Sequence, residues 1–233
     1  MNDSPLDDVT VVIPFDRVDG NRDWLAQAIG SFPKGTKYLV LENEDELAEA
    51  KNEGLRRAAT EYVAFFDADD IAVPGFLESL RALAGSADVV YPTAILFDED
   101  YECLDQAIYA EPFSGSRLLD FNFILSSSLV RRRKALEIGG FDPTLEVWEA
   151  QDLWIRMHRA GARFQPCPAA VLLYRQHPGQ RSETLVYREA LRARILANPI
   201  LLRAPSVNTY SLPSTVSIRK GRCGYSARKR KNR

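Results

Sequence analysis

Three carboxylates, Asp67, Asp69 and Asp70, stand within four positions at the end of a short apolar run, in the segment YVAFFDADD at residues 62–70. Carboxylates this close repel one another and raise one another's pKa unless a positive charge lies among them. Divalent cations such as Mg²⁺ and Mn²⁺ prefer oxygen ligands and remove this penalty. The segment predicts a metal site at the carboxyl end of a buried strand, with room for a phosphate-bearing substrate. The alternative is a solvated turn that caps a helix beginning near Pro74.

Strand and helix patterns alternate around this segment. Short apolar runs predict strands, and apolar residues at helical spacing predict the helices between them. The expected strands are 9–14, 38–41, 62–66 and 88–96, and the expected helices are 22–32, 45–59 and about 74–85. This alternation predicts an α/β fold with a doubly wound, mostly parallel sheet, in which ligands bind beyond the carboxyl ends of the strands. Asp16, Glu42 and Asp67 each follow such an end, so we expect them to share one cleft.

The alternation weakens in the second half of the chain. Residues 98–115 are polar and are expected to be irregular. Beyond them the patterns predict strands at 121–130 and 171–174, and helices at 133–138, 151–160 and 183–197. From residue 199 onward we expect extended or disordered chain, since charged segments poor in apolar residues commonly stay unfolded.

Charge is divided unevenly along the 233 residues, although the formal net charge is only −2. Residues 190–233 contain 11 Lys and Arg and no Asp or Glu, which leaves −13 on residues 1–189. A basic end suits a polyanion such as DNA or an anionic membrane surface, but a solvated end that aids solubility is the alternative. No apolar stretch approaches the length of a transmembrane segment, and the N-terminus lacks the features of a secretory signal. We therefore expect a cytoplasmic protein, with peripheral membrane contact as a further option.

Several segments resemble the family 2 glycosyltransferases, and they appear in the order of that family. They are VTVVIPF at 9–15, KNEGL at 51–55, EYVAFFDADD at 61–70, SSLVRR at 127–132, GGFD at 139–142, QDLWIRM at 151–157 and YRQHP at 174–178. The resemblance implies a GT-A fold, a Rossmann-like, mostly parallel sheet with helices on both faces and an acceptor-side subregion after the metal motif. It divides one domain into a nucleotide-sugar half at 1–98 and an acceptor half at 99–198, followed by the basic tail at 199–233.

The resemblance also implies an activity, the inverting transfer of a sugar from a nucleotide-diphosphate donor, with a UDP-sugar expected, to an acceptor hydroxyl. Mn²⁺ or Mg²⁺ would neutralise the charge that builds on the leaving phosphate. By resemblance, Asp69 and Asp70 are the metal- and ribose-side carboxylates, and Asp67 orients the motif. Of the two, Asp70 rather than Asp69 is expected to coordinate the metal directly. His177 is expected as a third metal ligand or a diphosphate contact, with an ordinary loop histidine as the alternative.

The resemblance also implies which residue acts as the base, although this chain differs from the usual family pattern beside it. Asp152 is the expected general base, which would accept the proton of the acceptor hydroxyl. The family usually has an acidic residue just before this aspartate, whereas this chain has Gln151, so Glu149 is expected to bind the acceptor or to act as the base itself. Asp152 could instead simply favour the first turn of its helix.

The resemblance places the nucleotide against the end of the first strand and the elements beside it. The residues are Pro14, Phe15 and Asp16 in the turn, Glu42 after the second strand, and Asn52 in the following helix. After the second strand the family usually has an aspartate-rich turn with Ser or Thr, whereas this chain has Glu-Asn-Glu-Asp at 42–45, which leaves the nucleotide open.

Rival functions remain on the sequence alone. A nicotinamide-dependent dehydrogenase needs a Gly-rich turn after its first strand, and this chain has Pro-Phe-Asp-Arg there. A non-catalytic nucleotide-sugar-binding protein, or a scaffold whose basic tail binds a polyanion, is the alternative that Gln151 leaves open. The acceptor class stays open among polysaccharide, lipid, protein and DNA.

Overall fold

A computed structural model describes residues 6–16, 21–43, 46–145 and 148–178. Its elements in chain order are β1 (Val9–Asp16), α1 (Arg22–Gly30), β2 (Lys37–Asn43), α2 (Leu47–Arg57), β3 (Tyr62–Phe65), β4 (Ile71–Ala72), α3 (Phe76–Leu83), β5 (Val89–Phe97), β6 (Cys103–Ile108), α4 (Gly115–Asp120), β7 (Leu129–Arg131), α5 (Arg132–Glu137), α6 (Glu149–Arg159) and β8 (Phe164–Arg175). The predicted helix at 183–197 and the basic tail at 199–233 lie outside the described residues. Within the described ranges, no helix has the length and apolarity needed to cross a lipid bilayer.

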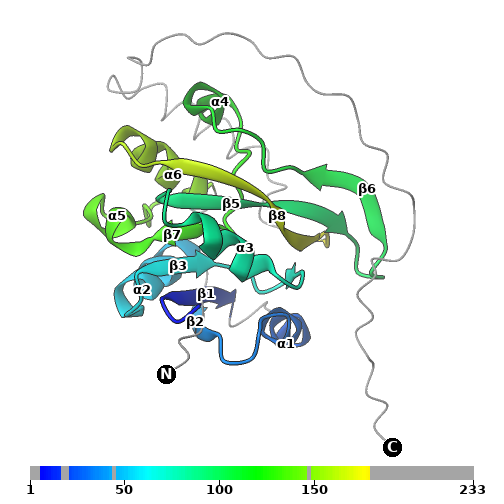
Figure 1. The fold of residues 1–233 in the computed structure, drawn as a ribbon. Helices are drawn as coiled ribbons and strands as arrows, with labels where there is room; N and C mark the ends of the chain where they lie inside the picture. Colours follow the sequence, from blue (N-terminus) through cyan, green and yellow to red (C-terminus); the bar gives the residue numbers. More distant parts are fainter. Residues whose placement is uncertain (1–5, 17–20, 44–45, 146–147, 179–233) are drawn as a thin grey trace, which may run out of the picture.

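The strands form one mixed sheet in the order β2-β1-β3-β7-β5-β8-β4, with β6 paired to β5 (Figure 1). β1 pairs in parallel with β2 and β3, and β5 pairs in parallel with β8. β7, β4 and β6 run in the opposite direction. Five of the eight strands in the described part of the chain thus share one direction, which confirms the predicted α/β fold with a mostly parallel sheet.

Apolar side chains form a core on each face of this sheet. In β1 and β3, Val12, Val63 and Phe65 belong to one core, and Val11, Ile13 and Ala64 belong to the other. Successive residues of a strand point to opposite faces, which explains this period of two. The first core receives apolar side chains from α2, α4, α5 and α6, and the second receives them from α1 and α3. Helices therefore cover both faces, as predicted.

The structure departs from the expected elements mainly in the second half. The strand predicted at 171–174 is the end of the longer strand β8, which the sequence conceals because Pro166 and Pro168 are unusual within a strand. The prediction of a strand over 121–130 is wrong for most of its length, because only the end of that segment pairs, as β7. β6 lies inside the segment 98–115 that we expected to be irregular.

Candidate functional site

The acidic turn, defined here as residues 67–70, follows directly after β3 and leads into β4. The amide of Phe66 donates a hydrogen bond to the carbonyl of Val12 at 3.0 Å, so the parallel pairing with β1 extends to the edge of the turn. The amide of Asp70 closes the turn on the carbonyl of Asp67 at 3.2 Å. Asp67 and Asp69 are partly exposed, whereas Asp70 is buried. The sheet thus presents two of the three predicted carboxylates at the end of β3.

Asp70 lies behind the turn, against β8. Its Oδ1 accepts a hydrogen bond from the backbone amide of Arg175 at 3.0 Å. Its Oδ2 is buried and has no hydrogen-bond partner among the described residues. Burial raises the pKa of Asp70 well above its ordinary value, and the negative charges of Asp69 and Asp67 raise it further. A buried carboxylate oxygen without a donor is costly, so the turn favours a positive charge nearby.

Asp69 and His177 meet although 108 positions separate them in the sequence. His177 Nε2 lies 3.0 Å from Asp69 Oδ2, and this hydrogen bond is the main reason why the pKa of His177 is raised. The imidazole also packs against Trp24 of α1, with ring centroids 4.8 Å apart. The structure therefore brings together two side chains that the sequence suggested as ligands of one metal ion.

A buried ion pair lies close to the other end of the acidic turn. Lys51 Nζ in α2 is 2.6 Å from Glu149 Oε1 in α6, and it also donates to Ser126 Oγ at 2.6 Å. Burial raises the pKa of Asp67 to about 6, the positive charge of Lys51 opposes this rise, and the charges of Asp69 and Glu149 add to it. Glu149, predicted from the sequence, thus belongs to the same electrostatic cluster as the turn.

Lys51 has no role of its own among the residues predicted from the sequence. A signal for its burial was nevertheless present, because Leu47 and Leu55 stand four positions on either side of it in a helix. Residues spaced by four share one helix face, so this lysine belongs to the face that carries the leucines.

Asp152, the predicted general base, lies three residues after Glu149 in the first turns of α6. Its Oδ2 accepts hydrogen bonds from Arg156 Nε at 2.8 Å and pairs with Nη2 at 2.6 Å. Arg156 Nη1 in turn donates to the carbonyl of Ile138 at 3.1 Å. The Asp152 side chain is 20% exposed, whereas that of Glu149 is 7% exposed, so Asp152 is the more accessible of the two carboxylates.

The residues predicted to face the nucleotide lie at the carboxyl ends of two adjacent parallel strands. Phe15 of β1 pairs in register with Glu42 of β2, and Asp16 follows Phe15 at the strand end, after the buried Pro14. Arg22 spans both strands, because its guanidinium lies 5.3 Å from the Phe15 ring and its Nη1 lies 3.4 Å from Glu42 Oε1. The shared edge of β1, β2 and β3 was expected from the pattern of the chain.

Asn52 occupies a different environment. Its amide nitrogen donates to the carbonyl of Phe141 at 2.9 Å, and its carbonyl oxygen accepts from the amide of Phe141 at 2.8 Å. The side chain is buried and both of its ends serve this contact, which ties α2 to the turn after α5. Its contact with a nucleotide stays a prediction.

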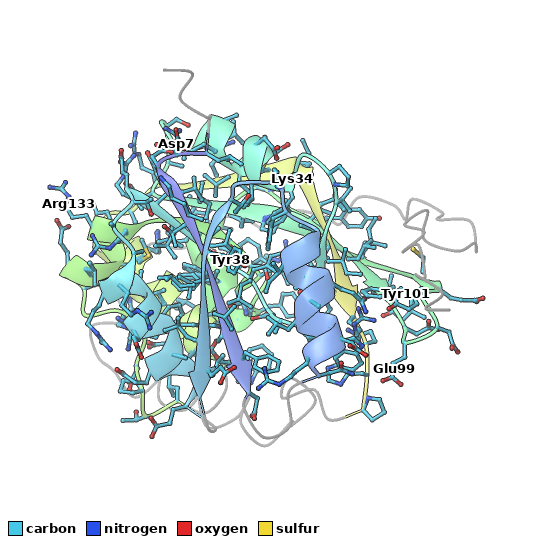
Figure 2. All side chains as sticks on the ribbon, turned by 90° about the horizontal axis from the view of Figure 1, so that it is seen from below. Asp7, Lys34, Tyr38, Glu99, Tyr101 and Arg133 are labelled. Carbon is cyan, nitrogen blue, oxygen red and sulfur yellow. The ribbon has the colours of Figure 1, made fainter. Side chains whose placement is uncertain are left out.

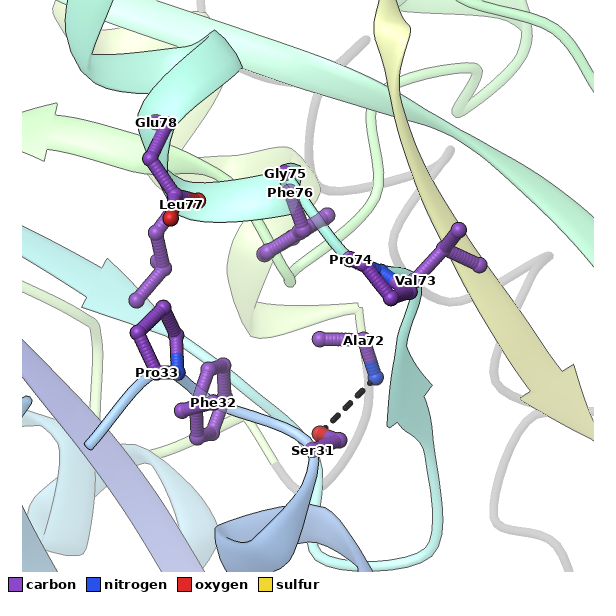
Figure 3. A pocket seen from close by; sticks show the side chains of 10 residues that line it. All are labelled: Ser31, Phe32, Pro33, Ala72, Val73, Pro74, Gly75, Phe76, Leu77 and Glu78. Atoms are coloured by element: carbon purple, nitrogen blue, oxygen red, sulfur yellow. Dashed lines mark hydrogen bonds between the residues drawn. The ribbon is translucent and has the colours of Figure 1, made fainter.

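A pocket of about 200 Å³ lies between the end of α1 and the start of α3 (Figure 3). Residues 31–33 and 72–78 line it, and Ser31 Oγ accepts a hydrogen bond from the amide of Ala72 at 3.0 Å. None of the predicted site residues contributes to this lining, which is mostly apolar. The acidic turn, rather than this pocket, is therefore the candidate site.

Comparison with known proteins agrees with this architecture. The sequence profile of glycosyl transferase family 2 matches residues 3–124 of the 233-residue chain, which is more than half of it. Pre-mycofactocin glycosyltransferases from two strains of Mycobacterium tuberculosis are each 28% identical to the chain over 72% of its length. The match covers only 42% of either relative, so the chain spans less than half the length of these proteins.

Solved structures resemble the chain in fold. The crystal structure of a fragment (1–349) of S. aureus TarS in complex with UDP-GlcNAc gives a TM-score of 0.60 at 15% identity, over 81% of this chain and 65% of that one. The same fragment in complex with UDP gives 0.57 at 15% identity, over 82% and 66%. These are GT-A glycosyltransferases, and the sheet and helices described above have that fold. From its profile match and its GT-A architecture, the chain belongs to glycosyl transferase family 2.

Proposed function

We propose that this chain transfers a sugar from a nucleoside diphosphate donor to an acceptor hydroxyl. The observation that carries the proposal is the contact of Asp69 with His177 at the end of β3, inside a cluster that also includes Asp67 and Glu149. The relatives in the family support the reaction class, and the TarS structures with UDP and UDP-GlcNAc support a UDP-sugar as the donor. The edge formed by Phe15, Asp16 and Glu42 is the proposed place of the nucleoside.

We propose Mn²⁺ or Mg²⁺ as the cofactor. In the described ranges, no group of three or more His, Cys, Asp and Glu side chains is arranged to hold a metal ion by itself. A site with as few protein ligands as one carboxylate nevertheless fits, because Mg²⁺ is usually bound through one or two carboxylates together with substrate phosphates and water. Asp69 and His177 would hold the ion, and the unpaired Oδ2 of buried Asp70 supports a positive charge at this turn. When bound, the metal would act as a Lewis acid toward the leaving diphosphate.

The proton of the acceptor hydroxyl needs a base, and we assign this role to Asp152. Its carboxylate is partly exposed, and Arg156 holds it in one orientation. Glu149 is the weaker candidate because its carboxylate is buried in the ion pair with Lys51. A base on the sugar face opposite the leaving group gives inversion of the anomeric centre, by the logic that governs glycoside hydrolysis.

The test is donor turnover by the full chain with Mn²⁺ and a panel of nucleotide sugars, measured as release of the nucleoside diphosphate. Asp69→Asn should lower release by about 100-fold or more, because it would weaken the site of the cation whose positive charge stabilises the transition state. Asp152→Asn should lower transfer to an acceptor by about 10²–10⁴-fold, the usual contribution of a general base. The control is Glu53→Gln, which alters an exposed i,i+4 ion pair with Arg57 and should change nothing.

Two results would contradict this function. One is the absence of both diphosphate release and a metal-dependent thermal shift with every donor, which would favour a non-catalytic protein. The other is release by the Asp69→Asn variant at the level of the unchanged chain, which would move the chemistry away from the acidic turn.

A further inference from the structure

Arg175, at the end of β8, is an arginine without solvent exposure. Three aromatic rings surround its guanidinium, with the carbon Cζ 4.8 Å from the ring centroid of Trp24, 4.5 Å from that of Phe97 and 5.3 Å from that of Tyr101. These rings come from α1, from β5 and from the turn between β5 and β6. In Figure 2, Tyr101 lies on the side of the molecule where α1 runs. Cation–π contacts partly offset the cost of burying the charge.

The hydrogen bonds of Arg175 point to the acidic turn. Its Nε donates to the main-chain carbonyl of Asp69 at 2.8 Å, and its own amide donates to Asp70 Oδ1 at 3.0 Å. Its Nη2 donates to Gln27 Oε1 at 3.1 Å, and the hydroxyl of Tyr101 donates to the same oxygen at 2.8 Å. One side chain thus connects the turn to α1 and to the β5–β6 hairpin.

The same residue fixes the path of the chain toward His177. Gln176, between the two, donates its amide to the carbonyl of Phe97 at 2.7 Å, so β8 is held against β5 up to this point. The ring of Trp24 contacts both Arg175 and His177. Arg175 therefore supports both members of the Asp69–His177 contact, one through the turn carbonyl and the other through the chain and the shared indole.

Stability alone is a poor reason for such a residue. Replacing a whole buried ion pair or charge network by well-packed apolar side chains of similar size often leaves a protein as stable or makes it more so. A lysine would keep the charge, but it lacks the planar fork that reaches the turn carbonyl and Gln27 in fixed directions. The site thus uses the geometry of the guanidinium as well as its charge, which lowers the pKa of Asp70 against the effect of burial.

We propose that Arg175 is a positioning residue that holds Asp69 and His177 where both can contact one divalent cation. The inference rests on the proposed function, because it concerns the metal site assigned there. It adds a residue that touches neither substrate nor metal and acts through the main chain of the acidic turn. Residues that orient metal ligands in this way typically change metal affinity by about 10–100-fold when they are replaced.

The test is a titration of the full chain with Mn²⁺, followed by the electron paramagnetic resonance signal of the free ion. Arg175→Lys should weaken Mn²⁺ binding by about 10-fold or more. The matched control is Arg131→Lys. Arg131 also lies over an aromatic ring, 4.9 Å from the centroid of Tyr62, and bonds Asp88 and the carbonyl of Ala84, but it sits at the other end of β3. The Arg131→Lys variant should lose about as much thermal stability as Arg175→Lys, but it should bind Mn²⁺ with the affinity of the unchanged chain.

Tyr101→Phe provides a second variant in case Arg175→Lys does not fold. It removes only the hydroxyl that bonds Gln27, so it should weaken Mn²⁺ binding in the same direction and by less. If Arg175→Lys binds Mn²⁺ with the same affinity as the unchanged chain, this inference is overturned and the proposed function is left standing. Where only Tyr101→Phe folds, equal affinity in that variant has the same meaning. Equal weakening in the Arg131→Lys control also overturns it. Failure of the unchanged chain to bind Mn²⁺ overturns the metal site itself, and this inference with it.

Discussion

Lys51 and Glu149 form an ion pair beside the acidic turn that is almost completely removed from water. Taking two charges out of water costs several kcal/mol for each ion, and their attraction offsets this only when the geometry is good and other polar atoms are satisfied. Here Nζ meets both a carboxylate and the hydroxyl of Ser126 at 2.6 Å. The pair joins α2 to the first turn of α6, so it places the candidate acceptor side of the site relative to the acidic turn.

Lys51→Met should therefore destabilise the chain far more than the loss of a surface charge would. The substitution leaves Glu149 buried and without its cation, and breaking such a pair typically costs about 3–5 kcal/mol. Urea unfolding, followed by circular dichroism, measures the change in the free energy of unfolding. Adding Glu149→Gln to Lys51→Met should recover part of the loss, because the unpaired charge is then gone.

The control for this pair is Arg57→Met, which breaks the exposed i,i+4 pair with Glu53 on the outer side of the same helix. Exposed pairs of this kind contribute only about 0.3–0.5 kcal/mol. If Lys51→Met cost no more than Arg57→Met, the ion pair would not be the link between α2 and α6 that the structure indicates.

At the scale of elements, the turn after α5 decides how closely α2 can approach the acceptor half. Gly139 and Gly140 both have positive φ, at 88° and 72°, a region that favours glycine. Only Gly140 has a close neighbour, because a Cβ there would lie 2.3 Å from Asn52 Oδ1. The amide of Asn52 reaches the main chain of Phe141 only because this space is empty.

The two glycines give a matched pair of substitutions. Gly139→Ala should cost only the backbone strain of a left-handed alanine, about 1–2 kcal/mol. Gly140→Ala should cost clearly more, since it adds a clash with a buried amide that has two hydrogen bonds to lose. Thermal unfolding of both variants measures the difference, and equal losses would show that the contact between Asn52 and the turn carries little energy.

How far the elements and the site follow from the sequence depends on whether the cause is local. β1, β3 and α6 could be predicted because each carries its own apolar pattern, and the acidic turn could be predicted because its charges are adjacent. The length of β8 and the pairing of β7 could not be predicted, since they depend on strands that are distant in the sequence. The same holds for Lys51 and Arg175, whose partners Glu149 and Asp69 are 98 and 106 positions away. A local pattern can place a charged side chain on a buried helix face, as the leucines around Lys51 do, but the partner of that charge is decided by packing between distant segments.

At the scale of the whole molecule, the chain separates its charges. Residues 1–189 sum to −13 and residues 190–233 to +11, and the second group lies outside the described residues. The acidic turn contributes three of the negative charges within four positions. A segment as basic as residues 190–233 binds polyanions with release of their counterions, and such binding weakens as the salt concentration rises.

Deletion of residues 219–233 removes eight of these positive charges, namely Arg219, Lys220, Arg222, Arg228, Lys229, Arg230, Lys231 and Arg233. We expect the full chain to bind DNA or anionic vesicles at low salt, with an affinity that falls linearly in a double-logarithmic plot against salt concentration. The shortened chain should bind more weakly and with a shallower slope, because fewer counterions are released. Fluorescence anisotropy with labelled DNA measures DNA binding, and sedimentation with vesicles measures membrane binding. Thermal unfolding checks that the domain of the shortened chain is intact. Binding at low salt that is unchanged by the deletion would show that the basic end has no polyanionic partner of either kind and serves solubility instead.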